Sequence, residues 1–600
     1  MLSGISEKST MEGRQAPIRI QAPKLEQKRL SFCDNSLSGF EAWAKNLPMA
    51  NVGAAAKLLF QATREMNITQ IPGPLRYQML EVIRTPVHSI CNILSKRFLN
   101  QAVMLSDSDI KIMQLTQTLQ IQLATGYKHI VIHELANKKS NASKLLTFAT
   151  HRAIADLSLT ILRAYQLYSQ PPQYSWLEIH QLFALAETKG LSEYTVKDTR
   201  SQHIDGSTIH DVYVRALLLG CCKPNQLRQK ELAQIYFATE LWAPLVKITT
   251  VNDQKALFIF PQHRDAAPIY RSLAKQTPSG VTRGLNPNAL VMALQKHVNK
   301  ETDVTNIPQD MSDSVLIHLM HAWGNMTERS FRRTQNTGSV ELGFGFLASH
   351  YFSANEKSLP YLLKKWNIEL AENKFKPAGN ISDDVWDKSF DAGNSFSADA
   401  ENISFDSISF IDKNNGNDKS NIDDGPKANL HPAHIINTSP GGYGVSIESP
   451  PNNVQTGELV IIKEAKSNFC SLGCIRWIRT QQKKSTEVGI ELIAPRATSV
   501  AVRILNKTGD NGEFLRALHI PAMPAAGQEE TLILPSVPFK LGSKAEIADG
   551  KQQTRIQLLK RHNASRSFVQ YSYKSLTQVM PKEVKKDSGD DEFASIWDKL

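Results

Sequence analysis

The sequence predicts an α+β protein made of separate domains, with an all-helical part first and a β-rich part second. Apolar residues recur at three- and four-residue steps up to about position 243, whereas short β-branched runs separated by turn residues dominate from about 338 to 575. A length of 600 residues exceeds what one hydrophobic core usually supports. We therefore expect an all-helical N-terminal domain followed by a β-barrel and additional C-terminal strands.

The first part of the chain predicts a polar tail and then a helical domain. Residues 1–34 lack apolar periodicity and predict a flexible N-terminal tail, and the helical domain is expected over 35–243. One helical face carries the apolar residues Ile154, Leu157, Ile161, Leu162, Tyr165 and Tyr168. Helices are expected over 50–67, 73–99 with an interruption at Pro86, 107–137, 141–168, 174–188, 211–222 and 226–242.

Residues 244–326 predict a mixed connecting region. Two β-branched runs around a polar Asn-Asp pair indicate a β-hairpin over 244–261, and helices are expected over 286–299 and 311–325. The β-rich part begins with "GSVELGFGFLASHYF" at 338–352. An insertion follows over 353–431, and we expect disorder at 377–427, because eleven acidic residues, four lysines and few aliphatic residues cannot offset the entropy of ordering.

Charge and cysteine content narrow the class of protein. The net charge of +11 and the pI near 9.1 favour an anionic partner, which could be a nucleotide, a nucleic acid or a membrane surface. Six cysteines in so long a chain give no disulfide framework and fit a reducing compartment. No apolar run approaches the ~20 residues of a membrane span, and the start lacks a secretory apolar region. We therefore expect a cytoplasmic protein without a membrane span.

Two short patterns are the candidates for ligand binding. Arg329, Arg332 and Arg333 stand directly before the first strand of the β-rich part, and "NTSPGGYGV" begins at Asn437. Arginine donates paired bonds to phosphate or to the Hoogsteen edge of guanine, and its planar face stacks on a base. Asn437 and Ser439 could pair with a guanine edge, and Gly442 would let the backbone approach a ligand closely. Taken singly, the arginines could be a cationic patch after a helix and the second pattern only a turn.

Together, the RxxxR of Arg329 and Arg333 and the NxSxxG of 437–442 resemble the PilZ domain, the bacterial receptor module for cyclic di-GMP. The later segments "GELVIIK", "CIRWIRTQQ" and "STEVGIELI" resemble successive strands of that small barrel. The resemblance implies a PilZ-like β-barrel over 327–352 and 432–505, with a cyclic di-GMP site formed by Arg329, Arg332, Arg333, Asn437, Ser439 and Gly442.

The spacing of the two patterns departs from the family. Arg333 and Asn437 are 437 − 333 = 104 positions apart, where an ordinary PilZ domain has about one pair of strands. Long surface insertions cost little, because loop-closure entropy grows only logarithmically with length. If the arginines instead belong to the end of the helical part, the barrel is a degenerate module that lacks them.

The remaining chain predicts an additional β region over 506–578 and an acidic-aromatic tail over 579–600. The β region could be an extended sheet or a second small barrel, and its basic, aromatic end would also suit a nucleic acid, although amphipathic strands are the preferred interpretation. In the tail, Trp597-Asp598-Lys599 repeats Trp386-Asp387-Lys388. Acidic-aromatic segments of this kind can dock into grooves, although a chance repeat within acidic tails explains the pattern at least equally well.

No catalytic pattern stands out. His129 and His133, with Glu134, lie one helical turn apart but in the wrong order for HExxH and without a third ligand, so no metal or cofactor is expected. The sequence therefore favours a non-enzymatic effector that binds cyclic di-GMP at the barrel and acts through its helical domain. The alternative is a scaffold or adaptor with a non-binding PilZ-like module. A protein partner is expected for the helical domain or the Trp597 tail, and a nucleic acid is not.

Overall fold

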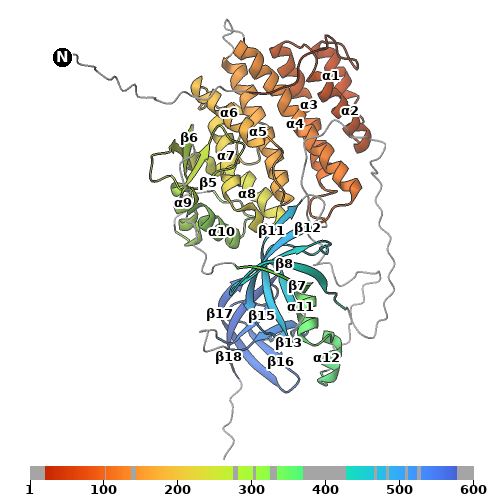
Figure 1. Ribbon diagram of the computed structural model, residues 1–600, viewed down its shortest axis with the longest axis vertical. Coiled ribbons are helices and arrows are strands. Elements are labelled where there is room, and N and C mark those ends of the chain that lie inside the picture. Colours follow the sequence, from red (N-terminus) through yellow and green to blue (C-terminus); the bar gives the residue numbers. More distant parts are fainter. Residues whose placement is uncertain are drawn as a thin grey trace, which may run out of the picture.

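The computed structural model describes residues 20–101, 103–136, 143–274, 281–301, 306–324, 334–368, 427–464, 469–481, 485–506, 511–522, 529–565 and 567–576. Figure 1 shows a helical body at one end of the longest axis and β-barrels at the other. The α+β organisation expected from the sequence is confirmed. Three segments for which the sequence made predictions fall wholly or partly outside the described residues: the first part of the N-terminal tail (1–19), nearly all of 377–427, and the C-terminal tail (579–600).

The helical body is built around the long antiparallel helices α3, α4 and α5 (Figure 1). Its helices are α1 (Leu37–Lys45), α2 (Val52–Met66), α3 (Gly73–Ser95), α4 (Asp107–Ala136), α5 (Ser143–Gln166), α6 (Ser175–Thr188), α7 (Ile209–Cys221) and α8 (Gln229–Trp242). Side chains cap helix starts: Asn51 accepts from the N–H of Ala54, and Thr208 and Asp211 form a capping box. Pro86 lies inside α3, so the expected interruption there is wrong.

Helix α5 is long and contains an apolar stretch. Among the described helices it is the one that could cross a membrane by length and composition, with 78% of its most apolar stretch buried inside the protein. Its apolar residues belong to the main core of the helical body.

The expected flexible tail over 1–34 is wrong for its described second part. Leu30 is buried, and Gln27 forms a β-bridge with Thr69 just after α2. The backbone N–H groups of Glu26 and Gln27 both donate to the carbonyl of Ile68, at 2.7 and 2.9 Å. The polar sequence of this segment could not predict these contacts, because they join backbone groups of residues that lie far apart along the chain.

The region after α8 is part of the helical body. Its strands are β3 (Lys247–Thr250), β4 (Phe258–Pro261), β5 (Ile269–Tyr270) and β6 (Thr282–Asn286), in the spatial order β3-β6-β4-β5. The expected hairpin over 244–261 is therefore wrong, because β6 lies between β3 and β4. Helices α9 (Asn288–Val298) and α10 (Asp313–Gly324) follow. Trp323 of α10 packs edge-on against Trp242, at 6.0 Å between ring centroids, and its indole donates to the carbonyl of Leu218.

A short pair of strands, β1 (Val196–Lys197) and β2 (Gly206–Ser207), lies between α6 and α7.

The first barrel closes in the order β10-β11-β12-β9-β8-β7. Its strands are β7 (Thr334–Phe344), β8 (His431–Ser439), β9 (Gly442–Ile447), β10 (Leu459–Glu464), β11 (Cys470–Gln481) and β12 (Ser485–Ala494). The expected β structure through 352 is wrong after Phe344, because the chain turns at Gly345, with φ of +89°, into helix α11 (Gly345–Ser353). Helix α12 (Leu359–Lys365) precedes the segment 369–426, which lies outside the described residues.

The additional β region is a second closed barrel, in the order β13-β14-β15-β18-β17-β16. Its strands are β13 (Thr498–Ile504), β14 (Leu515–Ile520), β15 (Thr531–Pro535), β16 (Lys544–Ala548), β17 (Gln553–Ala564) and β18 (Phe568–Ser575). The boundary expected after 505 is too late, because Val500 and Val502 of β13 lie in the core of this second barrel. The two barrels share an apolar cluster that includes Leu459 and Phe568.

The helical body contacts the barrels through backbone and arginine hydrogen bonds. The N–H of Thr480, on the β11–β12 hairpin, donates to the carbonyl of Tyr168 at 3.1 Å. Arg228 Nε donates to the carbonyl of Thr456 at 3.0 Å, and its Nη2 donates to Ser567 Oγ at 3.1 Å. One buried arginine therefore joins the helical body to both barrels.

Candidate functional site

The NxSxxG segment forms a tight hairpin between β8 and β9. Asn437 and Ser439 end β8, Gly442 begins β9, and Ser439 Oγ donates to the carbonyl of Gly442 at 3.4 Å. A bulge between Ile435 and Asn437 shifts the register of the pair. The three residues predicted from this segment therefore lie together at one end of the first barrel.

Gly442 is required by the barrel itself. Its φ is +148°, and a Cβ at this position would lie 2.0 Å from the carbonyl oxygen of Ile490 on β12. The sequence predicted a close approach of the backbone to a ligand at this residue. The close approach observed is to the neighbouring strand, which is enough to explain the glycine.

Asn437 lies over a second glycine on the outer face of the barrel. Its partner across the strands is Gly444, whose Cβ would lie 2.8 Å from Asn437 Oδ1 and 2.9 Å from Nδ2. Tyr443 and Val445 contribute to the barrel core, so Gly444 between them faces outward. The bare Cα of Gly444 thus leaves room for the amide of Asn437 on this face.

The same outer face continues across two more strands. Gly444 pairs with Gly489 of β12, which in turn pairs with Trp477 of β11. A Cβ on Gly489 would lie 1.8 Å from Trp477 Nε1, so the indole covers this glycine. We call the row Gln335, Asn437, Gly444, Gly489 and Trp477 the outer-face row. It offers two amides and an aromatic ring on a floor of two glycines, and only Asn437 was predicted from the sequence.

Strand pairing brings the residues that directly follow the RxxxR pattern next to the NxSxxG segment. Thr334, which follows Arg333 in the sequence, pairs with Thr438, and Gln335 pairs with Asn437. Arg329, Arg332 and Arg333 themselves lie outside the described residues. Thr334, the first described residue after the RxxxR pattern, thus lies opposite Thr438, the residue between Asn437 and Ser439 on the neighbouring strand.

Acidic side chains are held near the hairpin by their own partners. Tyr443 Oη donates to Glu464 Oε1 at 2.7 Å, and burial together with this carboxylate raises the pKa of Tyr443 to about 12. Glu491, opposite Gly442, is paired with Arg476. Tyr443 thus stays protonated at neutral pH and remains a hydrogen-bond donor.

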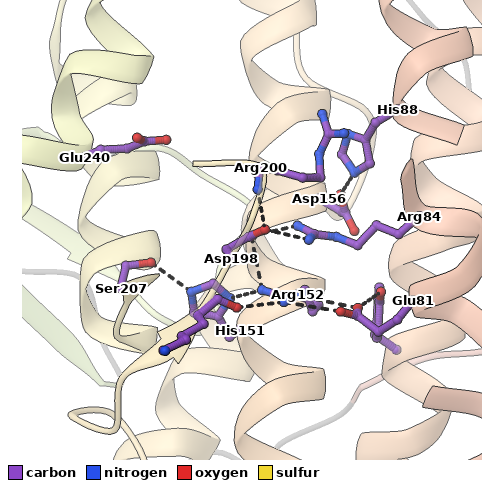
Figure 2. Close-up of polar contacts among 12 residues, drawn as sticks. Glu81, Arg84, His88, His151, Arg152, Asp156, Asp198, Arg200, Ser207 and Glu240 are labelled. Carbon is purple, nitrogen blue, oxygen red and sulfur yellow. Dashed lines mark hydrogen bonds and ion pairs between the residues drawn. The ribbon is translucent and has the colours of Figure 1, made fainter. Parts of the chain in front are cut away.

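The helical body contains a second polar cluster, which the sequence did not predict (Figure 2). Arg84 donates to both carboxylate oxygens of Asp198, at 2.7 and 2.8 Å, and Arg152 Nη1 lies 3.1 Å from Asp198. Arg152 also contacts Glu81 at 3.2 Å, and His88 Nε2 lies 2.8 Å from Asp156 Oδ1. These residues come from α3, α5 and the segment after β1, and nothing local in the sequence marks them.

This cluster has the character of a structural network. Arg84, His88, Arg152, Asp156 and Asp198 are all buried. Burial raises the pKa of Asp198, but hydrogen bonds and charge from Arg84, and the charge of Arg152, offset this and hold the pKa below its usual value. The paired charges therefore fasten the segment that carries β1 and β2 onto the helices.

His129 and His133, which the sequence raised as possible metal ligands, have different surroundings. His129 is buried, and burial lowers its pKa to about 4. His133 is exposed and its Nδ1 lies 3.1 Å from Glu134 Oε1. Within the described residues, no group of three or more histidine, cysteine or acidic side chains could hold a metal ion.

Three family models match consecutive parts of the chain. They are described as "Cyclic-di-GMP receptor FimW, N-terminal domain" over residues 38–254, "Cyclic-di-GMP receptor FimW, middle PilZ domain" over 257–499, and "FimW C-terminal beta-barrel domain" over 500–576. The PilZ resemblance is therefore confirmed, with a distinct N-terminal domain before it. The middle model begins before β4 and ends at the start of the second barrel.

A curated relative matches over nearly the whole chain. It is "Cyclic-di-GMP receptor FimW" from Pseudomonas aeruginosa, 32% identical over 611 residues that cover 98% of this chain and all of the relative. No solved structure matches the chain.

Proposed function

The chain belongs to the FimW family of cyclic-di-GMP receptors, and from that premise we propose that it binds cyclic di-GMP at its first barrel. The observation that supports this most is the pairing of β7 with β8. It brings Thr334, the neighbour of Arg333 in sequence, opposite Thr438 in the NxSxxG segment. This pairing across the long insertion supports a site that combines the arginines with the NxSxxG segment.

We propose that Arg329, Arg332 and Arg333 supply the positive charge and the planar donors of this site. A cyclic dinucleotide carries two phosphates and two guanines, and arginine can donate to phosphate, donate to the guanine edge or stack on the base. Asn437 and Ser439 would contact a guanine edge, and Gly442 would keep the hairpin in the geometry that presents them. The exposed side of the outer-face row would extend this surface towards Trp477.

The coupling to the helical body would run through residues 325–333. This segment joins the end of α10 to the start of β7 and carries the three arginines. Helix α10 is fixed to the helical body by Trp323 and by His318, whose Nε2 lies 2.8 Å from the carbonyl of Cys222. A ligand held by the arginines would thus restrain the connection between barrel and helical body. It would shift that arrangement only by binding one state better than another.

The helical body is proposed as the output or partner-binding part of a cytoplasmic effector that is not an enzyme. The family is named for a receptor, and in the polar cluster of Figure 2 the buried residues Arg84 and Arg152 both pair with Asp198. A buried network of paired charges suits a structural role better than it suits a reaction with a substrate.

Isothermal titration of the full chain with cyclic di-GMP tests the proposal, with GTP as the nucleotide control. We expect binding at micromolar or lower concentration that Arg333→Ala removes and that GTP does not reproduce. Equal heats for the protein and Arg333→Ala would contradict the site, and no binding to either would leave the chain as an adaptor with a non-binding barrel.

A further inference from the structure

A groove of about 640 Å³ lies on the helical body between the segment 27–32 and helices α1 and α2. We call it the α1–α2 groove. Its apolar lining is Phe32, Trp43, Leu58, Ala62 and Ile68, and its charged lining is Arg29, Arg64 and Glu65. The volume falls within the range of protein sites that bind small molecules or peptide side chains. None of these residues takes part in the proposed nucleotide site.

One wall of the α1–α2 groove is fixed by hydrogen bonds. Gln27 bridges to Thr69, and the N–H of Gln70 donates to the carbonyl of Gln27 at 2.7 Å. Ser31 Oγ donates to Glu65 Oε2 at 2.7 Å. The segment 27–32 is therefore held along the end of α2 before any partner arrives. A groove formed in advance costs less ordering entropy on binding.

The lining combines exposed apolar and basic side chains. Leu58 is 36% exposed although it is a leucine in the middle of α2, and Arg29 and Arg64 are both exposed. The rings of Phe32 and Trp43 already pack on each other at 4.6 Å, so no slot remains between them for a nucleotide base. Glu65 would also repel a phosphate. This lining fits a peptide with an apolar face and acidic residues better than it fits a nucleotide.

The chain itself contains a peptide with those properties. In the segment 590–600, "DDEFASIWDKL", the four apolar residues Phe593, Ile596, Trp597 and Leu600 stand at i, i+3, i+4 and i+7. This is the spacing of anchors on one face of a helix that binds in a groove. The same segment has four acidic residues and one lysine, which complements Arg29 and Arg64.

The segment of the same copy cannot easily reach the groove. Residues 577–592, between β18 and the anchors, span at most about 55 Å when fully extended. Figure 1 places β18 and the helices α1 and α2 towards opposite ends of the longest axis, so most of the helical body and of the barrels lies between them. Helix α4 alone, with 30 residues within the helical body, is about 45 Å long.

We propose that the segment 590–600 of one copy docks in the α1–α2 groove of a second copy, so that the chain associates head to tail. Trp597 and Ile596 would contact Phe32, Trp43 and Leu58, and the acidic residues would face Arg29 and Arg64. The contact uses two different surfaces of the chain, so it is heterologous and builds a ring or an open assembly.

Sedimentation velocity of the full chain over a range of concentrations tests this contact. We expect concentration-dependent association that Trp597→Ala and Leu58→Asp each weaken by about tenfold or more. The matched control is Leu541→Asp, which changes a leucine 64% exposed on the second barrel and should leave association unchanged. Circular dichroism melting of Leu58→Asp checks that the helical body remains folded.

A labelled peptide of residues 588–600, titrated into full-length Trp597→Ala, provides a second readout in a protein whose groove residues are unchanged. We expect it to bind, and we expect a scrambled peptide and the additional change Arg64→Glu to weaken that binding. A chain that stays monomeric at all concentrations would overturn the proposal, including the case where the peptide binds. Association that neither Trp597→Ala nor Leu58→Asp weakens would overturn it as well.

Discussion

Gln335 and Asn437 lie directly opposite each other on β7 and β8, although 437 − 335 = 102 positions separate them in the sequence. The chain leaves the barrel after β7, forms α11 and α12, and returns at β8 to pair with the strand it left. A long excursion between paired strands is tolerated because its closure entropy grows slowly with length. The first described residue after the proposed arginines, Thr334, therefore lies beside the NxSxxG hairpin through this pairing.

The first prediction concerns the geometry that Arg333 supplies. Arg333→Lys keeps the positive charge but loses the planar fork, so we expect it to weaken cyclic di-GMP binding by about ten- to a hundredfold, the value of one charged hydrogen-bonding contact. Arg333→Ala should be at least as severe. Titration calorimetry measures both, and Arg264→Ala, at an exposed arginine of the helical body, is the control. A lysine variant with unchanged affinity would show that charge alone suffices.

The second prediction separates stability from binding at two neighbouring glycines. Gly442→Ala places a methyl group against the Ile490 carbonyl at a φ of +148°, so we expect a loss of about 1–3 kcal/mol in the free energy of unfolding. Gly444→Ala instead meets the mobile end of Asn437 and should displace that amide, with a smaller loss of stability. We expect weaker nucleotide binding from Gly444→Ala in a folded barrel. Urea denaturation and titration of both variants measure the difference, and equal stabilities would contradict it.

The course of the helices could be predicted from the sequence because periodicity is local, and the bounds of α2 to α8 lie close to those expected. Pairings between distant residues could not be predicted in this way. The place of β6 between β3 and β4 and the place of β13 in the second barrel are two examples. Both depend on hydrogen bonds between strands that are distant in the sequence. Asn437 of the site was visible in a pattern, whereas Gly444, Gly489 and Trp477 became a row only through register.

The third prediction concerns the buried charges of Figure 2. Asp198→Asn leaves Arg84 buried without its carboxylate partner and Arg152 with Glu81 alone, which should cost about 3–5 kcal/mol of unfolding free energy. Urea denaturation measures this loss. Glu341→Gln is the matched control, because Glu341 and Lys463 form an exposed pair at 3.9 Å and such pairs contribute about 0–1 kcal/mol. Similar losses in the two variants would mean that the network is not the anchor we describe.

The fourth prediction is a loss of stability on mild acidification. His180 is buried between Trp176 and Phe260, and burial lowers its pKa to about 4, while burial and the charge of Arg152 lower that of His151 to about 3. An unfolded histidine binds a proton near pH 6.5, so the unfolded state takes up more protons than the folded state below that pH. Stability should be fully present above about pH 6.5 and fall as the pH drops towards 4.

Urea midpoints at a series of pH values test this fall. Each histidine contributes at most about 1.4 kcal/mol per pH unit within the window. His180→Gln should reduce the slope, whereas His133→Gln, at an exposed position, should not. A slope that is the same in the protein and in His180→Gln would rule out His180 as a source of the effect.

The last prediction concerns Arg228, the side chain that joins the helical body to both barrels. Its guanidinium reaches the Thr456 carbonyl and Ser567 Oγ, and Ser567 Oγ in turn donates to Glu458 Oε2 at 2.5 Å. Arg228→Ala removes these contacts without touching the NxSxxG hairpin. We therefore expect cyclic di-GMP to bind with nearly unchanged affinity, while the helical body and the barrels unfold in separate steps.

Thermal melting followed by circular dichroism, with and without cyclic di-GMP, distinguishes the two behaviours. A ligand at a hundred times its Kd stabilises the unit that binds it by about 2.7 kcal/mol. In the unchanged protein this should shift the helical and the β transitions together, because Arg228 and the Tyr168–Thr480 contact couple them. In Arg228→Ala only the β transition should shift, whereas Arg264→Ala should behave like the unchanged protein. A helical transition that still shifts fully in Arg228→Ala would mean that Arg228 is not needed for the coupling, which would then run through the Tyr168–Thr480 contact or residues 325–333.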